Sequence, residues 1–262
     1  LAIAEVPGYD PHWIVTKAAD IREICRLGDT FHNGDRSKML VSKASEQLIR
    51  EYTGGDYNIL KTLVHLDGEE HLKFRNITQD RFTPRNVGQH EPMIREIARS
   101  YVAQLERNGP DCDFAREVAF QYPLEVICTL VGIPREDHAL MLKLTQWMFN
   151  YADPELRRPG ADPGNPAEQT ETCNRVYKEF EQYYAHVISD RQSCPRDDLA
   201  SLISNAKIDG CPMDHQGQIS YFVIASTAGH DSTAATLATA IWLLAERPEL
   251  LAQLQADAQL IP

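Results

Sequence analysis

The stretch from Ser220 to Ala245 constrains the fold more than any other part of the sequence. Across these 26 residues, only His230 and Asp231 can carry charge. A helix that is apolar all round is either buried in a large protein or crosses a membrane. An aspartate near the centre of a bilayer costs about 2.5–3.5 kcal/mol, and Ala, Ser and Thr outnumber Leu in this stretch. We therefore expect a buried core helix rather than a transmembrane helix.

The middle of this helix carries a run of small and polar residues, from Ala228 to Thr233. Gly229 in a helix interior costs about 1 kcal/mol relative to alanine, and a buried Asp231 needs a partner or a shifted pKa. The adjacent hydroxyls of Ser232 and Thr233 can donate back to carbonyls and bend the helix. Two interpretations fit these residues. The helix opens locally where a bulky group approaches, or two helices cross tightly beside a satisfied aspartate.

A second group of polar residues lies in the segment from Asp67 to Arg75. His71 and Arg75 are four residues apart, which places both side chains on one face of a helix. Lys73 lies about 200° away from His71 around the helix, so we expect it to face outward. Two stacked donors suit an acidic ligand such as a carboxylate. The alternative is an ordinary surface face on which Arg75 forms a salt bridge with Asp67 or Glu70.

The rest of the chain indicates a mainly α protein with a small β contribution. Residues 13–16 are β-branched and aromatic, which is typical of a strand, and Asp20 is expected to cap a helix that ends at Gly28. Residues 29–65 and 153–166 are rich in Gly, Pro or polar residues and are predicted loops. Apolar periodicity with start and stop signals predicts further helices: 69–82, 90–108, 114–131 with a kink at Pro123, 136–150, 168–191, 196–206, 215–246 and one that begins at Pro248.

Composition and charge exclude several classes of protein. The 262 residues are 43% hydrophobic and 24% charged, as in a folded globular protein. The formal charge of −12, from 38 acidic and 26 basic residues, disfavours nucleic acid and an anionic membrane surface as partners. The first residues show no signal-peptide pattern, so we expect the cytoplasm, where thiols are reduced. No C-x-x-C pair occurs among the six cysteines: Cys25, Cys112, Cys128, Cys173, Cys194 and Cys211.

Several segments, in the same order along the chain, resemble the cytochrome P-450 family, the haem-thiolate monooxygenases. Trp13–Ile24 resembles the first strand and helix B of that family, and Asp67–Arg75 resembles its helix C. Further matches follow in order: Phe82–Arg85 after helix C, Leu124–Pro134 as helix E and its exit, Ala228–Thr233 as the oxygen-activating segment of helix I, and Pro248–Leu251 at the start of helix J. The resemblance spans nearly the whole chain and has the character of soluble bacterial members.

This resemblance implies an incomplete P-450 fold, mainly α with a small sheet near the N-terminus. It would form one domain over residues 1–262, from the first strand and helix B through helix J. The implied cofactor is haem b. The implied activity is that of a monooxygenase which inserts one oxygen atom of O2 into a small hydrophobic, terpene-like substrate. A ferredoxin-type redox partner would supply the electrons.

The resemblance also assigns roles to individual residues. Cofactor binding would fall to propionate donors on helix C and to small residues that leave room for oxygen on helix I, namely His71, Arg75, Ala228 and Gly229. Proton delivery to the distal oxygen would fall to Asp231 together with Ser232 or Thr233. Substrate contacts are expected from three apolar residues: Trp147, Ile224 and Ala225.

Two departures from the family pattern matter. Ser232 stands where the family usually has threonine after the acid, so the hydroxyl that faces the iron is that of either Ser232 or Thr233. After helix J the family has a Glu-x-x-Arg helix and a loop with the ligand cysteine, and none of the six cysteines has the glycine that this loop places four residues earlier. We therefore expect no metal ligand in this chain. The ligand cysteine is expected in a missing C-terminal part, and this chain alone is expected to be inactive.

Two alternatives compete with this interpretation. An all-α metal-dependent phosphohydrolase would build a His/Asp metal centre from His65, His71, the His230–Asp231 pair and Asp257. The glycine at position 229 has no function in such a site. The other alternative is an inactive fragment, because the ligand loop is absent.

Overall fold

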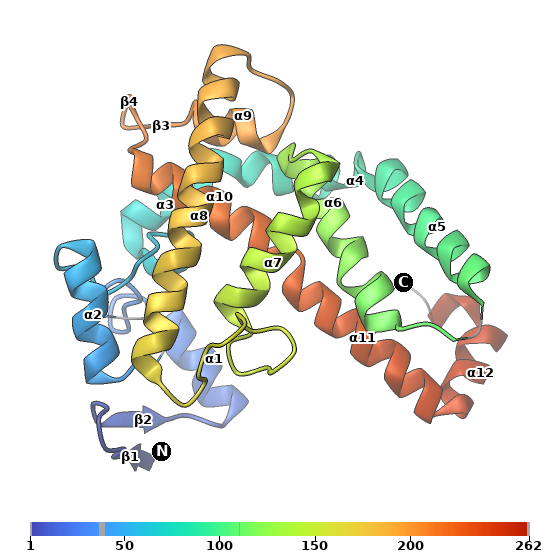
Figure 1. Cartoon of the computed structure of the whole chain (residues 1–262), viewed down its shortest axis with the longest axis horizontal. Coiled ribbons are helices and arrows are strands. Elements are labelled where there is room, and N and C mark those ends of the chain that lie inside the picture. The colour runs from blue at the N-terminus through green and yellow to red at the C-terminus, as the bar shows by residue number, and fades with distance from the viewer. Residues whose placement is uncertain (1, 37–39, 110, 261–262) are drawn as a thin grey trace. The chain divides into compact units, whose positions relative to one another are not determined.

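The computed structural model describes residues 2–36, 40–109 and 111–260. It confirms a mainly α fold with a small antiparallel sheet near the N-terminus (Figure 1). The α-helices are as follows: α1 Ala18–Arg26, α2 Lys43–Thr53, α3 Gly68–Thr78, α4 Pro84–Gly88, α5 Glu91–Asn108, α6 Gln121–Val131, α7 His138–Phe149, α8 Pro166–Ser193, α9 Leu199–Ser204, α10 His215–Ala228, α11 Asp231–Glu246 and α12 Pro248–Ala256. The remaining elements are short: strands β1 Ala2–Ala4, β2 His12–Ile14, β3 Lys207–Ile208 and β4 Cys211–Pro212, 3-10 helices η1 Leu63–His65, η2 Gln79–Phe82, η4 Arg135–Asp137 and η5 Ala258–Leu260, and the π-helix η3 Ala115–Ala119. Within the described residues, no helix is both long and apolar enough to cross a membrane.

The N-terminal residues form a two-stranded antiparallel sheet, in which β1 pairs with β2 and Ala2 lies opposite Ile14. The predicted strand is therefore confirmed, but it begins one residue earlier and ends at Ile14. Helix α1 follows the predicted course, although Lys17 rather than Asp20 occupies its N-cap. Asp20 lies in the first turn instead, where a negative charge interacts favourably with the helix dipole.

Helix α2 corrects the prediction that residues 29–65 are mostly loop. Ser42 caps the N-terminus of this helix by accepting a hydrogen bond from the Ser45 amide, and Gly54 ends it in the left-handed conformation with φ 74°. Ile49 is buried along the helix. The serine cap and the terminal glycine are the sequence signals that identify α2. Residues 37–39 of the predicted loop lie outside the described residues.

The chain divides into two compact units, residues 1–86 with 143–224 and residues 87–142 with 225–262. In the first unit, α2 and α9 pack along α8, the longest helix (Figure 1). The rings of Phe180 and Tyr184 stack with centroids 5.9 Å apart, and those of Tyr184 and Phe222 stack at 4.6 Å. All three side chains are fully buried. Stacked aromatic rings therefore fix α10 to α8.

In the second unit, α11 packs against α6 and the π-helix η3, and α5 packs against α6. The predicted helix over 114–131 is confirmed with an interruption, because η3 ends before α6 begins at Gln121. Pro123 has no amide hydrogen to donate to the preceding turn. The N–H of Phe120 donates five residues back, to the carbonyl of Ala115 at 2.9 Å. The helix is therefore distorted by the π-helix at Ala115–Ala119, a few residues before Pro123, where the sequence predicts a kink.

The apolar run forms two helices with a break between them. Gly229 and His230 separate α10 from α11, so the predicted helix over 215–246 is interrupted at these two residues. Every residue from 217 to 223 in α10 is buried, as expected of a core helix. The same prediction is wrong for the later turns of α11, which expose Ile241 and Trp242.

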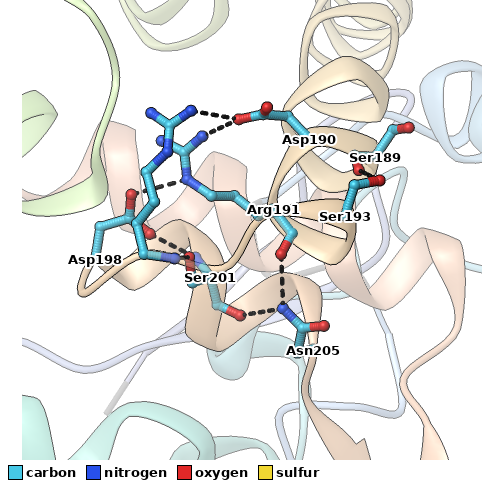
Figure 2. A network of polar contacts seen from close by, with 8 residues as sticks. Ser189, Asp190, Arg191, Ser193, Asp198, Ser201 and Asn205 are labelled. Carbon is cyan, nitrogen blue, oxygen red and sulfur yellow. Dashed lines mark hydrogen bonds and ion pairs between the residues drawn. The ribbon is translucent and has the colours of Figure 1, made fainter.

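A buried arginine joins the end of α8 to α9, as Figure 2 shows. The Arg191 side chain is 6% exposed, its Nε donates to Asp198 at 2.8 Å, and its Nη1 pairs with Asp190. Asp198 also caps α9 by accepting a hydrogen bond from the Ser201 amide at 2.7 Å. Partial burial opposes ionisation of Asp198, but the hydrogen bonds from Ser201 and Arg191 bring its pKa below the ordinary value. The corner between α8 and α9 therefore depends on a charged, buried pair.

Arg191→Ala leaves the Asp198 carboxylate, which is only 12% exposed, without its cation, so we expect the free energy of unfolding to fall by about 2–4 kcal/mol, near the lower end of the range for a broken buried pair. Arg196→Ala is the matched control, because Arg196 also pairs with Asp190 but is 56% exposed, where an ion pair contributes about 0–1 kcal/mol. Urea unfolding of the full-length protein compares the two variants. Equal losses in both would contradict the assigned burial of Arg191.

Candidate functional site

Helix α3 presents two donors on one face. His71 and Arg75 lie one turn apart, His71 half-buried and Arg75 exposed. Neither side chain has a hydrogen bond or ion pair with another residue in the part of the chain that the structure describes. Phe74 and Thr78, on the neighbouring face of the helix, are buried. The two donors therefore share one helix face, as their spacing predicts.

The acidic neighbours of Arg75 are engaged elsewhere. The Asp67 carboxylate accepts hydrogen bonds from the backbone N–H groups of Asn33 and Gly34, between α1 and α2, the shortest at 2.5 Å. Glu70 forms an ion pair with Lys61 at 2.7 Å. The alternative that Arg75 pairs with Asp67 or Glu70 is therefore wrong. A guanidinium has five N–H donors, and those of Arg75 remain available to a ligand.

Lys73 differs from these two donors. It points away from the face of His71 and Arg75, but its side chain is only 34% exposed and is held by Asp209 at 2.8 Å and by Glu69 at 3.0 Å. The hydrogen bonds from Lys73 to these carboxylates raise its pKa. Asp209 belongs to the turn between β3 and β4. The prediction that Lys73 simply faces outward is therefore corrected: its ammonium group is tied to the β3–β4 hairpin.

Tyr221 fixes the place of α3 on α10. Its hydroxyl donates to the carbonyl of Phe74 at 3.2 Å and accepts from Thr78 Oγ1 at 2.7 Å. The neighbouring Ser220 Oγ accepts from the Lys61 amide at 2.9 Å. Burial raises the pKa of Tyr221, so its hydroxyl stays protonated. The sequence analysis missed this residue, although a hydroxyl-bearing ring inside an apolar run is a signal that could have identified it.

Gly229, at the break between α10 and α11, lies against α6. A methyl group on Gly229 would be 2.6 Å from Cγ1 and 2.8 Å from Cδ1 of Ile127, well inside van der Waals contact. Both Ala228 and Gly229 are nevertheless exposed. The structure thus accounts for the glycine by a close crossing of helices. Room for oxygen beside Ala228 and Gly229 stays a prediction.

The two hydroxyl groups after the break have different surroundings. Thr233 Oγ1 donates to the carbonyl of Gly229 at 3.4 Å. The Ser232 hydroxyl has no hydrogen-bond partner within the described parts of the chain. Both residues are exposed, and Asp231 is half-buried in the first turn of α11. The hydroxyl left free to exchange a proton with a ligand is therefore that of Ser232.

His230 is the buried polar group of this junction, with 1% of its surface exposed. Its Nδ1 lies 2.9 Å from the carbonyl oxygen of Ser226, so Nδ1 carries the hydrogen, because a carbonyl oxygen only accepts. Its Nε2 is buried and has no hydrogen-bond partner among the residues described. Burial lowers the pKa of His230, against smaller opposing effects of the Ser226 carbonyl and Asp231. From the sequence alone, the one role predicted for His230 is that of a ligand in the alternative metal centre.

The three residues expected to touch substrate are half-buried. Trp147 in α7 lies beneath the ammonium group of Lys143, which is 4.8 Å from the centre of the ring. Ile224 and Ala225 are consecutive residues of α10. Apolar residues at such spacing belong more often to the protein core than to a substrate pocket, so the substrate contacts of these three residues stay a prediction.

The alternative metal centre has no counterpart in residues 2–36, 40–109 and 111–260, where no group of three or more His, Cys, Asp and Glu could hold a metal ion. His65, one of its proposed ligands, shares a hydrogen bond of 2.7 Å with Thr62. All six cysteines are free. Burial raises the pKa of Cys128 to about 12 and that of Cys173 to about 11, whereas a thiolate ligand requires a lowered pKa.

The described residues fit one part of a haem site. His71 and Arg75 are carboxylate donors without partners in the described chain, which suits the two propionates of haem. The exposed small residues at 228–229, followed by the free hydroxyl of Ser232, give an open polar segment in an apolar helix. These two groups belong to different units of the chain.

This sequence and this fold recur in known proteins. The family model described as Cytochrome P450 matches residues 38–261. Cytochrome P450-terp from Pseudomonas sp is 36% identical over 262 residues, which are 100% of this chain and 61% of that protein. CYP108D1 from Novosphingobium aromaticivorans has a TM-score of 0.83 and 32% identity over 98% of this chain and 59% of its own. CYP268A2 from Mycobacterium marinum, solved with pseudoionone, has a TM-score of 0.83 and 26% identity over 98% of this chain and 58% of its own. The chain spans about three-fifths of the length of these relatives.

Gly229→Ala places a methyl group within 2.8 Å of Ile127, so we expect overpacking to lower the free energy of unfolding by about 1–3 kcal/mol. Gly88→Ala is the control, because nothing lies within 4 Å of a methyl group at that position. Ile127→Ala makes room, so the double variant at 127 and 229 should lose less stability than the sum of the single losses. Additive losses in urea unfolding of the full-length protein would show that Ile127 does not constrain Gly229.

Proposed function

Because this chain belongs to the cytochrome P-450 family, we propose that the full-length protein is a haem-dependent monooxygenase that inserts one oxygen atom of O2 into a small hydrophobic substrate. Haem b, the cofactor of this family, supplies the iron chemistry that activates dioxygen when it is bound. The observation that carries the proposal is the pair of donors on α3, which have no partner in the described chain although every acidic neighbour is paired.

In this proposal, His71 and Arg75 bind the haem propionates. Hydrogen bonds between charged groups are roughly twice as strong as neutral ones, and the planar guanidinium of Arg75 can donate two parallel bonds to one carboxylate. Tyr221 supports this role, because its bonds to Phe74 and Thr78 hold the buried face of the same helix. Lys73 takes no part, since its ammonium group is bound to two carboxylates.

In this proposal, Asp231 and Ser232, just after the break, deliver a proton to the reacting oxygen. Ser232 donates its hydroxyl hydrogen toward the reacting oxygen, and Asp231 returns a proton to it directly or through water. Thr233 cannot donate in the same position, because its hydroxyl is bound to the carbonyl of Gly229. Ala228 and Gly229 would leave space for O2 on their exposed side, since the position of a Gly229 side chain is already taken by Ile127.

We propose a terpene-like substrate. The relative with 36% identity is named Cytochrome P450-terp, and one solved neighbour binds pseudoionone. Contacts from Trp147, Ile224 and Ala225 suit an apolar ligand without charge. We further propose a ferredoxin-type electron donor and a place in the cytoplasm, where the six free cysteines stay reduced. The ligand cysteine lies outside this chain in this proposal, so residues 1–262 alone are inactive.

Arg75→Ala removes a propionate donor, so we expect haem to leave the full-length protein about 10–100 times faster, as the loss of a hydrogen bond to a charged group implies. Lys73→Ala, two residues away on α3, is the matched control and should retain haem at the normal rate. Transfer of haem to apomyoglobin measures both rates. Equal haem loss in the two variants would contradict the assigned face of α3.

Ser232→Ala removes the free hydroxyl, so we expect oxygen to leave as hydrogen peroxide and the ratio of product to peroxide to fall about tenfold or more. Thr233→Ala should lower this ratio less, because that hydroxyl is bound to a carbonyl. Asp231→Asn should slow product formation while the spectral shift induced by substrate persists. Product and peroxide are measured per electron consumed. A larger effect of Thr233→Ala than of Ser232→Ala would reverse the assignment of the two hydroxyls.

A further inference from the structure

At the break between α10 and α11, a side-chain hydrogen bond replaces a backbone one. In an uninterrupted helix, the N–H of His230 would donate to the carbonyl four residues back, which is that of Ser226. In this structure that N–H donates to the carbonyl of Thr227 at 3.4 Å. The carbonyl of Ser226 accepts from Nδ1 of the His230 ring at 2.9 Å. The ring of His230 thus takes the place of its own amide.

The helix resumes directly after this substitution. The Ala234 amide donates to the carbonyl of His230 at 2.8 Å, so His230 is bonded to the helix on both sides of the break. Asp231 and Ser232 lie within the turn that this second bond closes. The backbone of this turn, and with it the direction of the Cα–Cβ bonds of Asp231 and Ser232, is therefore tied to the position of His230.

The burial of His230 favours one protonation state. A proton on Nε2 would create a donor in a buried place where no acceptor is found among the described residues. The neutral ring with its hydrogen on Nδ1 satisfies the carbonyl of Ser226 and leaves only a lone pair on Nε2. The lowered pKa of His230 agrees with this state.

We infer that His230 is a positioning residue. The neutral ring, with its hydrogen on Nδ1, donates to the Ser226 carbonyl and so fixes the backbone of the break, from which the Cα–Cβ bonds of Asp231 and Ser232 project. The consequence for proton delivery rests on the proposed function. The hydrogen bond that holds the break does not depend on that function. A ring that only filled space would show no preference between its two nitrogens.

Three substitutions separate the hydrogen bond of the ring from its volume. His230→Asn places an amide nitrogen where Nδ1 lies, His230→Gln places one where Nε2 lies, and His230→Leu has a similar volume without a donor. Hydrogen exchange of the backbone amides of residues 229–234 is measured in the full-length protein. We expect about fivefold faster exchange in His230→Leu, as the loss of one hydrogen bond implies, and exchange close to that of the native protein in His230→Asn.

Unchanged exchange in His230→Leu would overturn the inference. If His230→Gln restored native exchange and His230→Asn did not, the ring would act through Nε2, and the inference would be overturned. If neither amide restored native exchange, the ring would act through its volume, and the inference would be overturned as well. Nitrogen chemical shifts of His230 in the reduced, carbon monoxide-bound protein should show the hydrogen on Nδ1. A hydrogen on Nε2, or on both nitrogens at neutral pH, would contradict the inference.

The catalytic consequence is measured separately. In the haem-loaded enzyme, His230→Leu should lower the ratio of product to peroxide by about the same fivefold factor, and His230→Asn should restore most of it. An unchanged ratio together with faster exchange would show that the break does not direct proton delivery. If the full-length protein binds no haem, the proposed function fails, and hydrogen exchange still decides the role of His230.

Discussion

The close approach of Gly229 to Ile127 is the constraint on which the candidate site depends. An apolar helix over residues 215–246 would otherwise satisfy its own carbonyls in one regular ladder and present no polar group. The crossing with α6 leaves no space for a Cβ at position 229, and the helix breaks at that residue and the next. His230 and Thr233 then donate to carbonyls beside the break. Polar groups thereby enter an apolar helix at a small cost, because carbonyls beside the break accept hydrogen bonds from side chains.

The donors on α3 also depend on which neighbouring groups already have hydrogen-bond or ion-pair partners. Tyr221, in the buried part of α10, holds α3 through its backbone and through Thr78. Each acidic group near Arg75 has another partner, and Lys73 is tied to a hairpin. What remains on this helix is a histidine and an arginine with free donors. Exposed charges are commonly solvated rather than paired, so it is the shared face of a histidine and an arginine, and not the missing partners alone, that suits an acidic ligand.

Much of the fold could be predicted from the sequence, because apolar periodicity and terminal signals mark the longer helices independently of their neighbours. Helix α2 was missed because its polar surroundings hid the cap at Ser42. The site was predictable in its residue types and only partly in its geometry. The spacing of His71 and Arg75 fixes a shared face, but the partner of Gly229 comes from a helix about a hundred residues away. No local pattern could have shown that Ile127 fills that place, or which of two adjacent hydroxyls stays free.

In the proposed enzyme, this chain supplies the propionate donors and the proton-delivering segment, and the axial cysteine lies outside residues 1–262. The absorption spectrum of the reduced protein under carbon monoxide tests this division most directly, because the red-shifted Soret band for which the family is named requires an axial thiolate. We predict this band for the full-length protein, and no such band for residues 1–262 supplied with haem. Its absence from the full-length protein, or its appearance in the 262-residue chain alone, would contradict the account.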